Sequence, residues 1–268
     1  MNRLLLIVFT LWIGMPAVGA DIKKKEPLFG KKHQEYTVTS SELKGAVFYL
    51  VSGHGGPDPG CIGYYQGKEL HEDEYAYDII LRLGKKLLEH GAKVHFIITD
   101  AKDGIRDSYV LNNSKREKCG GKQIPLNQLD RLKQRSETIN ALYKKDKSSY
   151  KRAVFIHVDS RARKNQIDVF FYHAPNSIYG KRLATGIQDM FRAKYKKFQP
   201  NRGFDGEVSE RGLYVLQNTQ PVGVFIEVGN IQNSLDQKRL VIPSNREALA
   251  KWIADAIVVD HKKGKAAR

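Results

Sequence analysis

The chain has 268 residues and a mass of 30.4 kDa, and 41% of its residues are hydrophobic, so one sizeable core can form without a second domain. Its formal net charge of +16 attracts polyanions of any kind, including anionic polymers and membrane surfaces, although an ordinary solvated surface is an equal interpretation. No zinc-finger, RRM or KH pattern is present, so the sequence predicts no specific nucleic-acid binding.

Residues 1–20 have the pattern of a secretory signal peptide. Arg3 gives a positive start, residues 4–13 are apolar, and small residues end at Ala20. The segment is short for a membrane span, and the alternative is an uncleaved anchor. The sequence therefore predicts an exported protein, periplasmic or extracellular after removal of the signal. In such a protein Cys61 and Cys119 could form a disulfide, which the sequence alone leaves open.

The mature part of the chain alternates between strand and helix patterns. Residues 21–44 are polar, rich in lysine and without a period, and we expect a leader there. Periodicity predicts strands at 46–51, 92–99, 153–158, 167–172 and 222–228, and helices at 73–90, 126–144, 178–193 and 245–258. This alternation predicts a single α/β domain over residues 45–260, with a mixed, mostly parallel central sheet flanked by helices.

Two segments fall outside this alternation. The polar segment 103–125 predicts a long surface loop, and residues 261–268 form a basic tail.

Functional groups gather at the carboxyl ends of strands in open α/β sheets, and three candidates lie there. His54 follows the first strand between glycines, and His157 lies near the end of the strand at 153–158. Glu72 begins the first helix, where helical spacing places it on the buried face, whereas Glu74 aligns with Asp78 and is expected to face solvent. Each alone has an ordinary structural explanation. His54 could be a histidine in a turn, His157 a hydrogen-bonded histidine in the core, and Glu72 an acid favoured by the helix dipole. Together they form a plausible open Zn²⁺ site with a fourth position for water.

Glu227 is the sharpest signal, because this carboxylate interrupts the apolar strand at 222–228. Burial of an unpaired charge is costly, so a compensating group should lie beside it. Next to a metal site it is a suitable general base, and the alternative is a buried salt bridge.

These segments together resemble the zinc-dependent N-acetylmuramoyl-L-alanine amidases of the amidase 3 type, from about residue 46 to residue 258. The likeness rests on the order and spacing of the following residues: His54, Asp58-Pro59-Gly60, Gly63, Glu72, His157, Arg202-Gly203, Leu213-Tyr214-Val215-Leu216, Asn218-Thr219, Glu227, Gly229 and Asn233.

The resemblance implies that His54, Glu72 and His157 bind one zinc ion and that Glu227 is the catalytic carboxylate. The implied substrate is bacterial peptidoglycan, cut at the amide bond between N-acetylmuramic acid and L-alanine. Anionic wall polymers would then be a natural partner of the basic surface, and segment 103–125 is interpreted as an insertion that forms a lip over the groove. Two alternatives stay open at this point: another zinc-dependent amide hydrolase of the cell wall, such as a peptidase, and a non-catalytic wall-binding protein of the same fold.

Overall fold

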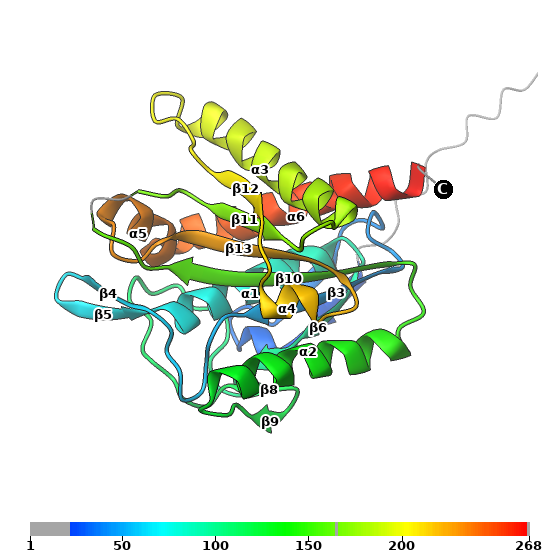
Figure 1. Cartoon of the computed structure of the whole chain (residues 1–268), viewed down its shortest axis with the longest axis horizontal. Coiled ribbons are helices and arrows are strands. Elements are labelled where there is room, and N and C mark those ends of the chain that lie inside the picture. Colours follow the sequence, from blue (N-terminus) through cyan, green and yellow to red (C-terminus); the bar gives the residue numbers. More distant parts are fainter. Residues whose placement is uncertain (1–21, 164–165, 267–268) are drawn as a thin grey trace, which may run out of the picture.

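A six-stranded sheet lies at the centre of the computed structural model, which describes residues 22–163 and 166–266 (Figure 1). Its strand order is β12 (Glu207–Glu210), β11 (Phe170–His173), β13 (Val222–Asn230), β10 (Tyr150–Asp159), β3 (Ala46–Ser52) and β6 (Lys93–Phe96). Neighbouring strands run parallel except β11 and β13, which are antiparallel. The predicted mixed, mostly parallel sheet is therefore confirmed. The predicted signal peptide lies outside the described residues.

The central strands are apolar because helices cover both faces of the sheet. All seven residues of β3 are buried, as expected for a parallel strand covered on both sides. The helices are α1 (Glu72–Glu89), α2 (Gln128–Lys145), α3 (Ile178–Phe198), α4 (Tyr214–Gln217), α5 (Ser234–Val241) and α6 (Pro243–Ala266). The four predicted helices are present, and α6 extends through most of the segment expected to be a basic tail.

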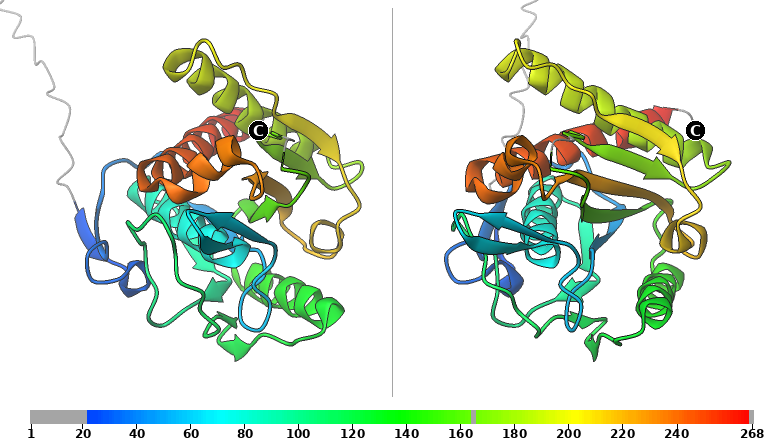
Figure 2. Two further views of the ribbon diagram at one scale, coloured as in Figure 1. Left: turned by 90° about the vertical axis from the view of Figure 1, so that its left-hand side faces the viewer. Right: turned by 60° about the vertical axis from the view of Figure 1, so that its left-hand side comes forward.

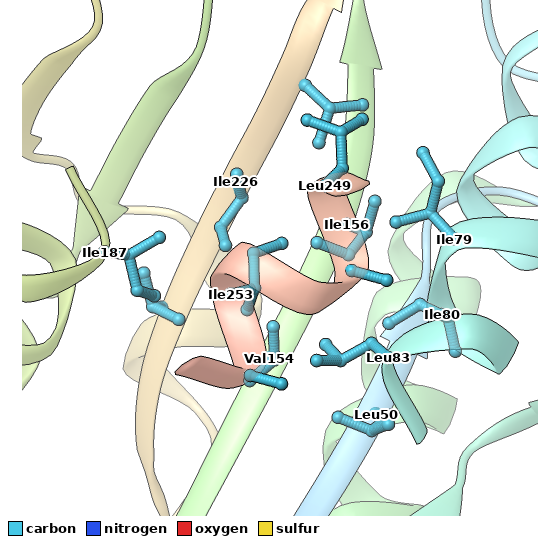
Figure 3. Close-up of a cluster of buried hydrophobic side chains, with 14 of the residues drawn as sticks. Leu50, Ile79, Ile80, Leu83, Val154, Ile156, Ile187, Ile226, Leu249 and Ile253 are labelled. Atoms are coloured by element: carbon cyan, nitrogen blue, oxygen red, sulfur yellow. The ribbon is translucent and has the colours of Figure 1, made fainter. Parts of the chain in front are cut away.

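Helices α1, α3 and α6 cover one face of the sheet and form the larger core with it (Figures 1 and 3). Aliphatic side chains from strands and helices meet there, among them Leu50, Ile79, Val154, Ile187 and Ile253. Each such side chain contributes roughly 1.5–3 kcal/mol when removed from water. This face therefore contributes the larger share of the apolar burial between the sheet and its helices.

Helices α2 and α4 cover the opposite face and form a smaller core (Figure 2). Ile139 of α2 and Leu216 of α4 pack there with Phe155 and Phe225 of the two central strands. Asn127 caps α2, because its side chain accepts a hydrogen bond from the backbone N–H of Asp130. Between α2 and the sheet lies the groove described below. Within the described residues, no helix is long and apolar enough to cross a membrane.

Residues 22–44, expected as a leader ahead of the fold, are instead part of it. They form β1 (Ile22–Lys25), the 3-10 helix η1 (Pro27–Phe29) and β2 (Glu35–Val38), and the two strands pair antiparallel. Phe29 is fully buried against Phe96, and Lys32 forms an ion pair with Asp107. Phe29 packs there with the partly buried Leu28 and Tyr36, and Leu43 at the end of the segment is buried in the larger core. These positions follow no helical or strand period, so no hydrophobic pattern marks the segment in the sequence.

Replacement of Phe29 by alanine is expected to lower the free energy of unfolding by about 3–5 kcal/mol, because it empties a fully buried aromatic site. Ile22→Ala in the same segment is the matched control, since Ile22 is 57% exposed; its effect should stay within about 0.5 kcal/mol. Urea denaturation of both variants measures the difference. Equal stability of the two variants would contradict the packing of this segment as part of the fold.

Three short strands and a hairpin occupy the remaining connections. The hairpin of β4 (Ile62–Tyr65) and β5 (Lys68–His71) leads directly into α1. The predicted strand at 92–99 is divided into β6 and β7 (Ile98–Thr99), and β7 pairs with β8 (Lys118–Cys119), which pairs with β9 (Lys122–Gln123). Segment 103–125, expected to be a surface loop, thus carries a small sheet and the buried residues Ser114 and Glu117.

Candidate active site

Three residues from distant parts of the chain converge at the carboxyl ends of β3 and β10. His54 follows β3, Glu72 begins α1, and His157 lies near the end of β10. One ligand atom from each lies within 4.8 Å of the other two. The structure therefore brings together the three residues that the sequence singled out as metal ligands.

Two glycines give these side chains room. A Cβ atom on Gly53 would lie 2.4 Å from the ring of His157, and one on Gly60 would lie 2.6 Å from Oε2 of Glu72. Real contacts of a Cβ atom are longer than this, so neither position accepts a side chain without rearrangement. His54 itself has a φ of 55°, which turns the chain sharply after β3. The site therefore requires glycine at positions 53 and 60, because a larger residue at either position would collide with His157 or Glu72.

The spacing of the three side chains suits a small divalent cation. Nε2 of His54 lies 3.3 Å from Oε2 of Glu72, and Nδ1 of His157 lies 3.0 Å from Oε1 of the same carboxylate. Ligand atoms of a tetrahedral zinc ion with bonds of about 2.0–2.1 Å are about 3.3 Å apart. The donor set of two imidazoles and one carboxylate is also one that zinc accepts. The residues present therefore fit a zinc ion.

Glu72 is held as a buried anion. The backbone N–H groups of Cys61 and Val158 each donate to its carboxylate at 3.0 Å. Burial opposes its charge, but the hydrogen bond from His157 and the adjacent His54 outweigh burial and lower the pKa of Glu72 to about 2. An ionised, fixed carboxylate is the form that binds a metal.

His54 is oriented by a second carboxylate. Its Nδ1 lies 2.7 Å from Oδ2 of Asp58, which Arg131 also contacts at 2.6 Å. This arrangement fixes the ring and leaves Nε2 directed at Glu72. Burial disfavours protonated His54, but Asp58 and Glu72 together raise its pKa. Burial lowers the pKa of His157, so this ring is held neutral, with its Nδ1 beside Glu72.

Glu227 lies beside the three residues on the neighbouring strand. In the parallel register of β10 and β13 it is directly opposite His157. Its Oε2 is buried without a hydrogen-bond partner, and among the described residues no ion pair reaches it. Burial and the nearby charges of Glu72 and Asp159 raise the pKa of Glu227 well above the usual value. The salt-bridge alternative considered from the sequence is therefore not realised within the described part of the chain.

A groove of about 220 Å³ opens beside His54 and His157. One wall is the sheet, with Phe225 stacked on the His157 ring at a centroid distance of 4.3 Å. The other wall is α2, which contributes Arg131 and Arg135. The groove is thus apolar on the sheet side and basic on the helix side, next to the candidate metal site.

The family model described as N-acetylmuramoyl-L-alanine amidase matches residues 49–259, which cover most of the central sheet and of the helices and all four candidate residues. The chain belongs to this amidase family. The match supports the peptidoglycan amidase function that the sequence implied.

Individual amidases are similar to the chain over most of its length. A germination-specific N-acetylmuramoyl-L-alanine amidase of Bacillus subtilis (strain 168) is 26% identical over 223 residues, which cover 82% of this chain and 81% of that protein. Among solved structures, the CwlD amidase from Clostridioides difficile, in complex with the GerS lipoprotein, has a TM-score of 0.60 at 24% identity and covers 80% of this chain and 98% of its own. The amidase Ami1 from Mycobacterium smegmatis has a TM-score of 0.58 at 15% identity, covering 82% and 99%. These structures share the fold of this amidase.

The structure corrects the expectation for Glu74 and answers the open question about the two cysteines. Glu74, expected to face solvent, is only 1% exposed, because Arg106 and segment 103–125 pack over that side of α1. Cys61 and Cys119 of this amidase are both free thiols. Arg131 was not predicted as part of the site, since nothing in the sequence relates a residue of α2 to Asp58.

Proposed function

We propose that this amidase is zinc-dependent, that His54, Glu72 and His157 hold the metal, and that Glu227 is its general base. The observation that supports this proposal is the convergence of two imidazoles and one carboxylate, with a second, unpaired carboxylate on the adjacent strand. Zinc bound there would supply Lewis acidity toward the scissile carbonyl and would lower the pKa of a water molecule.

The protein groups would carry the proton transfers. Glu227 has a raised pKa and a free oxygen, so it can accept a proton from the attacking water and deliver it to the departing amine. Its place opposite His157 is set by the β10–β13 ladder, so this group is positioned before the substrate binds. The leaving amine would be the amino group of L-alanine in the stem peptide.

The groove is a suitable place for that stem peptide. Peptide stems carry free carboxylates, and the guanidinium of Arg131, which also pairs with Asp58, lines the α2 wall of the groove. The apolar wall around Phe225 can contact the aliphatic parts of the peptide. We further propose that residues 1–20 export the protein and that its net charge of +16 favours contact with anionic wall polymers or membrane surfaces.

Digestion of purified peptidoglycan by residues 21–268 tests the function. With zinc present, mass spectrometry should detect intact stem peptides that begin with a free L-alanine amine, together with uncut glycan strands. A chelator should stop their release, and added zinc should restore it. Release of crosslink fragments would instead favour a wall peptidase, and metal-dependent binding without any product would favour a non-catalytic wall protein.

Asp58→Asn is expected to lower zinc affinity by about 10- to 100-fold, because it removes the charge that orients and polarises the His54 ring. Competition with a chromophoric chelator measures the affinity. Asp189→Asn is the matched control, since Asp189 is an exposed acid on α3. If the two variants bind zinc equally well, Asp58 has no role in supporting the metal.

A further inference from the structure

A second group of oxygen ligands lies beside the candidate zinc site, within the protein. Asp73 and Glu74 follow Glu72 in the first turn of α1, and Glu117 comes from segment 103–125. One carboxylate oxygen from each lies within 4.8 Å of the other two. No role in the amidase reaction proposed above uses these three residues.

All three side chains are removed from solvent. Asp73 is 3% exposed, Glu74 is 1% exposed and Glu117 is 5% exposed. The cation paired with the group is Arg106, which donates to Oε2 of Glu74 at 2.6 Å. With all three carboxylates ionised, the one guanidinium leaves an excess of two negative charges, and burial of that excess is costly unless a further cation binds or a carboxyl group takes up a proton. Without such a cation, burial and the neighbouring acids raise the pKa of Asp73 to about 9.

Asp73 marks the place where this cation would bind. Its Oδ1 accepts a hydrogen bond from the backbone N–H of Glu74 at 2.9 Å. Its Oδ2 is buried, and no donor among the described residues reaches it. By contrast, Glu117 accepts from the backbone N–H of Gly56 at 2.9 Å, and Ser114 donates its backbone N–H to Glu74. The cluster of the three carboxylates therefore includes one buried oxygen, Oδ2 of Asp73, that has no hydrogen-bond partner among the described residues.

We propose that Asp73, Glu74 and Glu117 bind a calcium ion. Calcium takes carboxylate and backbone oxygens as ligands at about 2.3–2.6 Å and tolerates irregular geometry. The site contains no histidine or cysteine, so it lacks the nitrogen and sulfur donors that zinc prefers. A doubly charged cation also matches the excess charge of the group.

Such an ion would connect three parts of the chain next to the catalytic site. It would join the first turn of α1, immediately after Glu72, to segment 103–125. Through Glu117 it would also hold Gly56, which lies two residues after His54. The bound cation would therefore stabilise the loop and the helix start that carry two of the candidate zinc ligands.

Calcium titration of the zinc-loaded protein tests this proposal. Isothermal titration calorimetry should detect one site with a Kd between about 10⁻⁵ and 10⁻³ M, the range of calcium sensors and extracellular modules. At 100 times the Kd, calcium should raise the Tm by about 5 °C or more. Metal analysis should show that zinc content is unchanged, because calcium does not compete for the imidazole site.

Asp73→Asn and Glu117→Gln should each weaken calcium binding at least about tenfold and remove the rise in Tm, whereas Asp189→Asn should bind as the original protein does. Circular dichroism identifies a variant that fails to fold, in which case the other variant decides. Absence of calcium binding at about 10 mM would overturn the proposal, and so would equal affinity in all variants. A third outcome would also overturn the proposal: neither the original protein nor Asp73→Asn responds to calcium, and Asp73→Asn is folded and more stable than the original. That result would mean that Asp73 is protonated and binds no cation.

Discussion

Glu227→Gln is expected to reduce the release of stem peptides by about 10²- to 10⁴-fold, because glutamine cannot accept the proton of the attacking water. The glutamine side chain has nearly the same shape, and Glu227 does not belong to the group of ligand atoms around Glu72. Zinc content should therefore stay at the value of the original protein. Initial rates of peptide release and metal analysis of the same preparation give the two measurements.

Glu207→Gln is the matched control, since Glu207 is exposed on the edge strand β12 of the same sheet. It should retain both activity and zinc. Simultaneous loss of zinc and activity in Glu227→Gln would mean that Glu227 belongs to the metal site and is not a separate base. Full activity would remove it from the reaction altogether.

His54→Ala is expected to lower zinc affinity by more than about 10²-fold, since loss of a partner that only orients a ligand already costs 10- to 100-fold. Stem-peptide release should fall with zinc occupancy and should recover in part at high zinc concentration. Equilibrium dialysis followed by metal analysis measures the affinity. The effect should exceed that of Asp58→Asn, because His54 is the proposed ligand and Asp58 only supports it.

His33→Ala provides the comparison for His54→Ala, because His33 contacts Asp107 and lies outside the group of ligand atoms. It should keep its zinc. If His54→Ala also binds zinc as tightly as the original protein, the three-residue site is wrong, even though the side chains lie together.

The central part of the fold could be predicted because its signals are local. The buried strand β3 is an apolar run, β13 is apolar around Glu227, and α1 has a clear helical period. The antiparallel placement of β11 could not be predicted, because strand order depends on contacts between distant segments. The same reason explains residues 22–44, where Phe29 and Leu43 are buried at separate points of the segment and follow no helical or strand period.

In the candidate site, too, local sequence signals gave correct predictions and contacts between distant segments could not be predicted. Helical spacing correctly placed Glu72 on the buried face. The interruption of an apolar strand pointed to Glu227, which is half-buried but has a buried carboxylate oxygen without a hydrogen-bond partner. The same spacing placed Glu74 in solvent, which is wrong because Arg106 and segment 103–125 cover that side of the helix. A helical period describes one helix and carries no information about the segment that packs on it.

The two walls of the groove come from different parts of the chain, and the helix wall also supports His54. Arg131 contacts Asp58, which orients the His54 ring, and Arg135 donates to the backbone carbonyl of His54. His157 and Glu227 are fixed to each other by neighbouring strands, whereas Arg131 and Arg135 belong to α2, which packs on the smaller core. Substitutions of Arg131 or Arg135 are therefore expected to alter the orientation of His54 as well as the groove wall, whereas the register of β10 and β13 keeps His157 opposite Glu227. Helix α2 is thus both a wall of the groove and a support of the loop that carries His54.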